Sequence, residues 1–254
     1  MARERYLVGV EKEDLQAEEA RVLTGKEKRK NWWYYHKFHV LAAAVLIAVA
    51  ASWIYTAFLR PKPDYSIGLI TSFSIPDEVR ANLEDHIAQY ADDRNGDGKV
   101  MVDVITYNFG DMLSSSDYEA MQASFTRFAG DAAMGTCMIY FHNPEALAAL
   151  GDNVAGFFQY NDGSPMPEEA RDYTNAQRPW ADFAGLADFQ SAGSEMSNWT
   201  PEVVQELCSR LSVSVRTREG SNIEGDEKMS AYYDDCLALL DRLESGERPA
   251  QAAE

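Results

Sequence analysis

The clearest chemical pattern in the sequence is an acidic loop with the spacing of cation ligands. Residues 93–100 read DRNGDGKV, which places oxygen-bearing side chains on Asp93, Asn95 and Asp97, followed by a glycine. Side chains at such alternate positions converge on a hard cation, and the next ligand would be the backbone carbonyl of Lys99. The pattern therefore predicts a weak calcium site in this loop.

The same loop departs from the calcium-binding pattern at its end. The last position of the pattern requires a carboxylate that binds through both oxygens, and Val104 stands there. A strand pattern follows the loop where a calcium loop is followed by a helix. Asp92 is a candidate for the missing oxygen. An N-G-D-G run also suits a plain polar turn between a helix and a strand, so both interpretations stay open.

A second candidate site is formed by polar residues at the ends of three predicted strands. In an open α/β sheet, ligands bind in the crevice at the carboxyl ends of the strands. Ordinary loop polarity and helix capping account for the same residue types, and a serine and an asparagine in this set are expected to begin helices. The candidate ligand-binding residues are Ser72, Ser74, Tyr107, Asn108, His142 and Asn143.

Linear catalytic motifs are missing from the sequence. It contains no GxSxG elbow, no HExxH, no Walker loop and no GxGxxG after the first predicted strand. A Ser–His–acid arrangement is possible in principle, for example between Ser72 and His142, but nothing in the spacing singles it out. The sequence therefore favours a protein that is not an enzyme.

The three cysteines give no metal or redox motif. Cys137, Cys208 and Cys236 form no CxxC pair, which argues against a zinc ribbon. Cys137 lies in an apolar run and is expected to be buried. Cys208 and Cys236 fall on separate predicted helices, and a disulfide between them in an oxidising compartment would leave one cysteine over.

The elements that position these residues alternate between strand and helix. That order predicts an α/β fold in which a mostly parallel sheet lies between two layers of helices. The predicted strands are 65–72, 99–107 and 136–141, and the predicted helices are 74–90, 116–129 and 144–150.

The C-terminal half has a weaker pattern. We expect a short strand at 156–160 and a long, partly ordered excursion over 161–199, which is rich in Gly, Pro, Asp and aromatic residues. A helix over 200–207, a late or edge strand over 211–218, a closing helix over 226–243 and a disordered tail over 246–254 complete the prediction.

Ahead of this domain lies a segment with the length of a membrane span. Residues 40–59 contain no charged side chain, and a helix of this length crosses the roughly 30 Å core of a bilayer. A soluble helix of this length would keep a polar face, and a signal peptide would have a shorter core and a shorter lead. The sequence therefore predicts a transmembrane helix over 39–60, between a tail of residues 1–38 and a domain of residues 61–245.

The flanks of the span predict its orientation. Basic residues crowd its N-terminal side, whereas only Arg60 and Lys62 follow it closely. The positive-inside rule then puts the N-terminus in the cytoplasm and the C-terminal domain outside the cell membrane. The tryptophan and tyrosine residues at 32–35 form an aromatic belt, and the basic cluster should attract anionic lipid heads of the inner leaflet.

The stretch NWWYYHKFHV, residues 31–40, resembles a juxtamembrane signature of uncharacterised single-pass membrane proteins of anaerobic Gram-positive bacteria. A GKEK lead-in at residues 25–28 belongs to the same resemblance. It covers about the first quarter of the chain, together with the acidic loop. The resemblance implies a membrane anchor with a variable extracytoplasmic domain, and it implies no activity.

The charge of the C-terminal part restricts its partners. From Arg60 onward, 14 Lys and Arg stand against 34 Asp and Glu, a net charge of −20. Such a surface repels nucleic acid and favours cations and basic partners. We expect a membrane-anchored binding or accessory module whose ligand or protein partner the sequence does not name. An anchored hydrolase with a non-linear active site, or a sensor acting through a cytoplasmic partner, are the alternatives.

Overall fold

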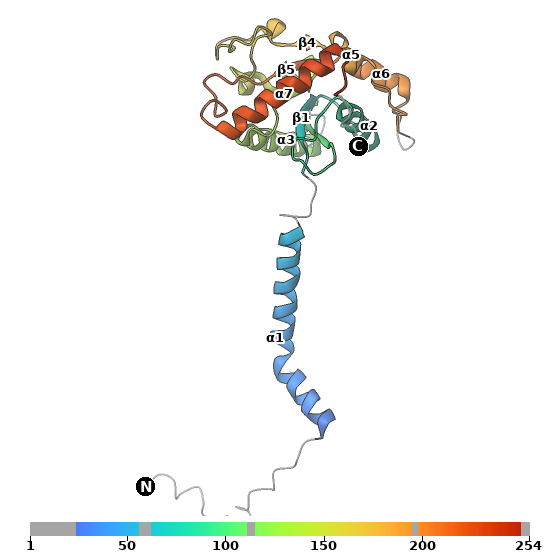
Figure 1. Cartoon of the computed structure of the whole chain (residues 1–254), viewed down its shortest axis with the longest axis vertical. Coiled ribbons are helices and arrows are strands. Elements are labelled where there is room, and N and C mark those ends of the chain that lie inside the picture. Colours follow the sequence, from blue (N-terminus) through green and yellow to red (C-terminus); the bar gives the residue numbers. More distant parts are fainter. Residues whose placement is uncertain (1–23, 56–61, 111–114, 195–197, 250–254) are drawn as a thin grey trace, which may run out of the picture. The chain divides into compact units, whose positions relative to one another are not determined.

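The computed structural model describes residues 24–55, 62–110, 115–194 and 198–249 (Figure 1). The chain divides into two compact units between Pro61 and Lys62. Most of the predicted tail, the end of the predicted span at 56–60 and the last residues, 250–254, lie outside the described residues.

The first unit contains one helix, α1 (Gly25–Ile54), of 30 residues. It begins well before residue 39, so the basic and aromatic segment is part of the same helix as the apolar stretch. A capping box explains the early start: Thr24 Oγ1 accepts a hydrogen bond from the Glu27 backbone N–H, and the Glu27 carboxylate accepts one from the Thr24 backbone N–H. α1 is long enough and apolar enough to cross a membrane.

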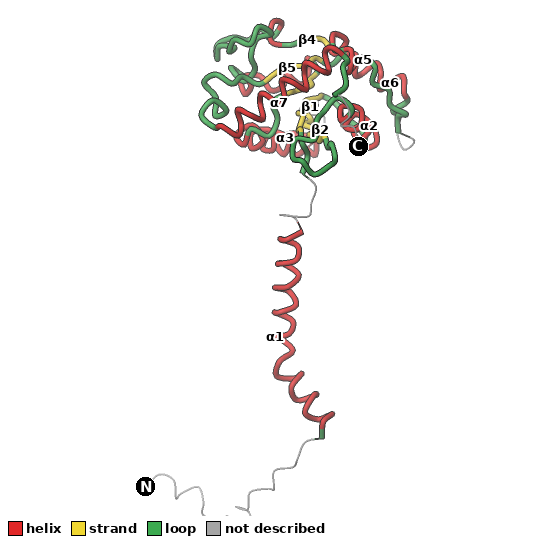
Figure 2. Tube along the Cα trace, in the orientation of Figure 1, coloured by secondary structure: helices red, strands yellow, loops and turns green. Residues whose placement is uncertain are grey.

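The second unit is built on a five-stranded sheet of order β2-β1-β3-β5-β4. Its strands are the yellow segments in Figure 2. β1 pairs in parallel with β2 and with β3, which confirms a mixed α/β fold around a largely parallel sheet. β5 is antiparallel to both of its neighbours, β3 and β4. The bounds are β1 Tyr65–Thr71, β2 Val102–Asn108, β3 Ile139–His142, β4 Arg178–Pro179 and β5 Ser212–Val215.

Helices cover both faces of this sheet (Figure 1). Consecutive strand residues point to opposite faces, so Leu69 packs with α2, α6 and α7, whereas Ile70 packs with α3 and α4. Each face therefore has its own apolar core. The helices are α2 Asp77–Ala88, α3 Ser115–Met134, α4 Pro144–Leu150, α5 Ala184–Ala187, α6 Pro201–Ser209 and α7 Glu227–Ser245.

The region between α4 and α6 is folded into short elements rather than one open excursion. The predicted strand at 156–160 is reduced to two isolated bridges, at Phe158 and Gln159. β4 forms the sheet edge, so the strand predicted near residues 211–218 lies inside the sheet. The 3-10 turns of the region are η3 Gly151–Val154, η4 Thr174–Ala176 and η5 Trp180–Asp182.

Candidate functional site

The predicted strand-end residues of β1 and β3 are brought together, and they bond to each other. The Ser72 backbone N–H donates to Asn143 Oδ1 at 3.0 Å, and Asn143 Nδ2 donates to Ser72 Oγ at 2.7 Å. Asn143 Nδ2 also donates to Glu145 Oε2 at 2.6 Å. Asn143 was expected to cap α4, but it makes no side-chain cap because its amide joins the two strand ends.

The end of β2 is tied to the β1 end in the same way. Asn108 Nδ2 donates to Ser74 Oγ at 2.6 Å, so Ser74 does not cap α2, whose N-cap position is held by Pro76. A Cβ on Gly110 would lie 2.5 Å from the carbonyl oxygen of Ser72, so only glycine permits the β2 end to come this close. Two hydrogen-bonded pairs, Ser72 with Asn143 and Ser74 with Asn108, therefore tie the ends of β3 and β2 to the end of β1, and we call these four residues the strand-end bracket.

The other two predicted residues of this set point into the core. Tyr107 is fully buried, and its hydroxyl donates to Asp131 Oδ2 at 2.8 Å. His142 is also fully buried, and its Nε2 lies 2.8 Å from Ser214 Oγ. Ser72 and His142 do not form the Ser–His–acid arrangement considered for a hydrolase, because His142 Nδ1 has no hydrogen-bond partner in the described part of the chain and Ser72 bonds to Asn143.

The surroundings of His142 fix its chemistry. Ser214 Oγ donates its proton to the carbonyl of Ala176 at 2.7 Å, so the His142 Nε2 must carry a proton and donate to Ser214. Burial lowers the pKa of His142 to about 4, because the charged imidazolium would be desolvated. The ring is therefore a neutral core group near neutral pH.

The predicted calcium loop winds around the side chain of Asp93. Its two carboxylate oxygens accept hydrogen bonds from the backbone N–H groups of Gly96, Asp97 and Gly98 at 2.7, 3.2 and 2.8 Å. Asn95 Oδ1 accepts from the Asp97 backbone N–H in the same loop at 2.9 Å. Asp93 Oδ1 accepts two of these bonds and Oδ2 accepts one, so Oδ2 keeps a lone pair, and the turn is compatible with cation binding but does not require it.

A buried carboxylate that the sequence did not suggest organises this loop. Asp64 is 2% exposed and accepts three backbone hydrogen bonds, from Arg94 and Asn95 at 2.9 Å each and from Met101 at 2.8 Å. Asp92, the candidate for the missing calcium ligand, is instead ion-paired with Arg242 at 2.8 Å. The loop is thus held by the start of β1 and by α7.

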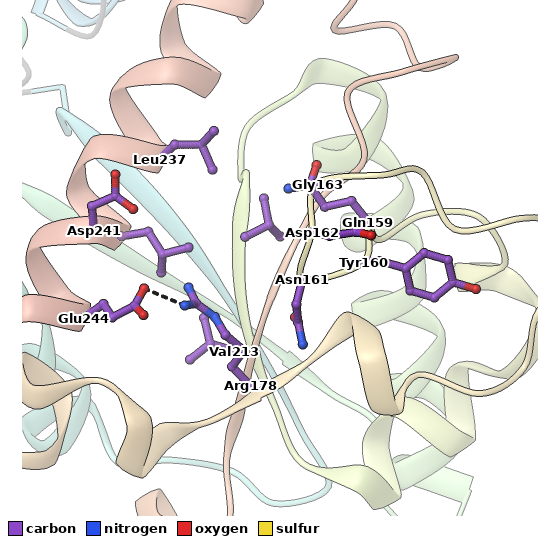
Figure 3. A pocket seen from close by; sticks show the side chains of 12 residues that line it. Gln159, Tyr160, Asn161, Asp162, Gly163, Arg178, Val213, Leu237, Asp241 and Glu244 are labelled. Atoms are coloured by element: carbon purple, nitrogen blue, oxygen red, sulfur yellow. Dashed lines mark hydrogen bonds and ion pairs between the residues drawn. The ribbon is translucent and has the colours of Figure 1, made fainter.

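Above β5 the second unit has a cavity of about 280 Å³ (Figure 3). Its apolar lining comes from β5 and α7, and its polar lining comes from the turn at 159–163, from β4 and from α7. Figure 3 shows α7 on one side of the cavity and the turn on the other. The lining residues are Gln159, Tyr160, Asn161, Asp162, Gly163, Arg178, Val213, Val215, Leu237, Leu240, Asp241 and Glu244.

Three carboxylates and one cation line this cavity. Arg178 is ion-paired with Glu244 at 2.5 Å, and its guanidinium lies 4.5 Å from the centre of the Phe183 ring. Asp162 Oδ1 accepts from the Ser164 side chain and backbone, which lowers the pKa of Asp162. Within the described residues, Asp241 makes no hydrogen bond or ion pair.

None of these cavity residues was predicted from the sequence. They come from four segments separated along the chain by up to about 80 residues, and no segment carries a motif of its own. The sequence predicted the secondary structure of three walls, as the weak strand at 156–160, the strand at 211–218 and the helix at 226–243, but it gave no sign that they meet at a cavity.

The three cysteines are free and buried. Burial raises the pKa of the Cys208 and Cys236 thiols to about 12, and that of Cys137 further. The disulfide considered between Cys208 and Cys236 is not formed.

Comparisons of the chain with known protein families, curated proteins and solved structures give no match.

Proposed function

We propose that this chain is a single-pass membrane protein whose C-terminal α/β unit is an extracytoplasmic binding module, with the cavity above β5 as its ligand site. The binding role rests on a contrast between polar groups that are hydrogen-bonded within the fold and polar groups that are not. The strand-end bracket uses its polar groups internally, whereas the cavity combines an apolar lining with a carboxylate, on Asp241, that has no partner within the described residues.

The anchor part of the proposal rests on α1 and on the charges around it. α1 has the length and composition of a membrane span, and basic residues precede its apolar stretch. The C-terminal part would then lie outside, where its net charge of −20 keeps it off anionic lipid.

Cysteine labelling in intact cells tests the orientation. The three native thiols are buried, so they give little background with a membrane-impermeant maleimide. Asp85→Cys, at an exposed position on α2, should be labelled in intact cells, and Lys26→Cys, near the start of α1, only after permeabilisation. The reverse pattern would show that the acidic unit is cytoplasmic.

A cavity-filling substitution tests the ligand site. Val215 is half-buried on β5 and lines the cavity, so Val215→Phe should fill it. In a screen of small molecules against the full chain in nanodiscs, compounds that bind the wild type should lose binding to this variant. Val203→Phe, the same change at an exposed position of α6, is the matched control. If every compound binds Val215→Phe and the wild type equally, the cavity is not the site.

A further inference from the structure

The size of the cavity above β5 restricts its occupant. A volume of about 280 Å³ lies just below the usual range of ligand pockets in proteins, which is roughly 300–1,000 Å³. It fits one long side chain or a short-chain molecule, and it is too small for a nucleotide. Four aliphatic side chains provide its apolar lining: Val213, Val215, Leu237 and Leu240.

The charge at the cavity favours a cation. Asp162, Asp241 and Glu244 face a single basic residue, Arg178, whose charge is already balanced by Glu244. Two carboxylates therefore remain without a counter-charge within the described residues. The chain from Arg60 onward has a net charge of −20 and would concentrate cations at this surface while it repels anions.

The lining also indicates the kind of cation. A divalent metal needs several converging oxygen ligands, and the described residues hold no group of three or more acidic, histidine or cysteine side chains placed for a metal ion. A quaternary ammonium group is usually held by several aromatic faces. Among the described residues that line the cavity, Tyr160 is the only aromatic one, and its ring points away (Figure 3). A cation that donates hydrogen bonds fits better.

We propose that the cavity binds an alkylammonium or alkylguanidinium group, either of a free small amine or of a lysine or arginine side chain in a peptide. This inference rests on the proposed binding function. The alkyl chain lies against the partly buried side chains of Val215 and Leu237, where it leaves water. The charged head donates to Asp241 and to the free oxygen of Asp162, in charge-assisted hydrogen bonds.

Four six-carbon probes separate charge from apolar contact. The full chain is reconstituted in phosphatidylcholine nanodiscs, whose lipid has no net charge, and binding of n-hexylamine, hexanol, hexanoate and hexyltrimethylammonium is measured by titration calorimetry. Hexylamine should bind most tightly, and hexanoate should not bind. Equal binding of hexylamine and hexanol, or tighter binding of hexanoate, would overturn the inference. No binding of any probe would overturn it too.

Charge-removing variants assign the head group. Asp241→Asn and Asp162→Asn should each weaken hexylamine binding about fivefold, the upper range for a partly exposed ion pair. Asp85→Asn makes the same charge change on exposed α2 and should have no effect. If all three variants bind like the wild type, the amine is not held at this rim.

The two proposals fail in different ways. If hexanol or hexanoate binds best and Val215→Phe abolishes that binding, the cavity is a ligand site and only the ligand class is wrong. If Val215→Phe leaves hexylamine binding unchanged, the site itself is misplaced. A lysine tripeptide with blocked ends, titrated beside hexylamine, distinguishes the two sources: tighter binding of the peptide indicates a side chain as the natural ligand.

Discussion

The carboxyl ends of β1–β3 and the cavity above β5 are both lined by polar side chains, but they use them differently. At the strand ends, the amides of Asn108 and Asn143 bond to serines on the neighbouring strand end. At the cavity, Asp241 has no partner in the described part of the chain, and Arg178 and Glu244 pair across the rim. The strand ends use their polar groups for hydrogen bonds within the fold, whereas the cavity leaves a carboxylate available to a ligand.

This difference separates residues that hold the fold from residues that can bind. A buried polar group that loses its partner retains its full desolvation penalty, so changes at the strand ends should reduce stability. A carboxylate already in water has little to lose on mutation, so changes at the cavity should affect binding and leave stability nearly unaltered.

The largest effect should come from acidification, through His142. Its pKa is about 4 in the folded state and about 6.5 when unfolded, so the unfolded chain binds a proton first as the pH falls. The free energy of unfolding should drop between pH 6.5 and 4, by about 3 kcal/mol from this group. Denaturant unfolding of the wild type and of His142→Gln should show this drop only in the wild type. If the free energies of unfolding of the two proteins fall in parallel as the pH is lowered, His142 is not a buried neutral ring.

The next largest effect should follow from cutting the strand-end bracket. Asn143→Ala removes the bonds to Ser72 and leaves the Ser72 backbone N–H unpaired, at a cost of about 2–3 kcal/mol. Asn153→Ala removes a single bond from an exposed asparagine and should cost about 0.5 kcal/mol. Thermal unfolding of both variants measures the difference, and similar melting temperatures would show that the bracket is not structural.

The acidic loop is intermediate between the strand ends and the cavity, because its carboxylates accept hydrogen bonds but are exposed to solvent. If calcium binds, the melting temperature of the full chain should rise modestly in millimolar calcium, by the equivalent of about 1.4 kcal/mol when calcium is ten times the Kd. The rise should disappear in Asp93→Ala and Asp97→Ala and persist in Asp85→Asn. An equal rise in all of these proteins would identify the loop as a turn only.

The smallest effect on stability should be at the cavity. Asp241→Asn should change the free energy of unfolding by no more than about 0.5 kcal/mol, because the side chain is exposed and makes no hydrogen bond or ion pair within the described residues. Comparison with Asn143→Ala by denaturant unfolding then separates the two regions directly. A loss of more than about 1 kcal/mol would show that Asp241 has a structural role.

Local patterns in the sequence determined the long apolar helix α1 and the first three strands. An uncharged apolar run of this length predicts a long helix. The alternation of strand and helix patterns predicts parallel pairing, because two parallel strands must be joined by a crossover. The closing helix was equally readable from its apolar stripe. Asp226 begins it with a side chain that accepts from two backbone N–H groups.

Tertiary structure decided where the polar side chains go. The sequence gathers Ser72, Asn108 and Asn143 near one sheet edge, but only the packed distances show that they bond to each other instead of to a ligand. The cavity was beyond prediction for a related reason. Its walls are four segments that meet because β5 pairs antiparallel between β3 and the edge strand β4, and long-range pairing of this kind leaves no local periodicity in the chain.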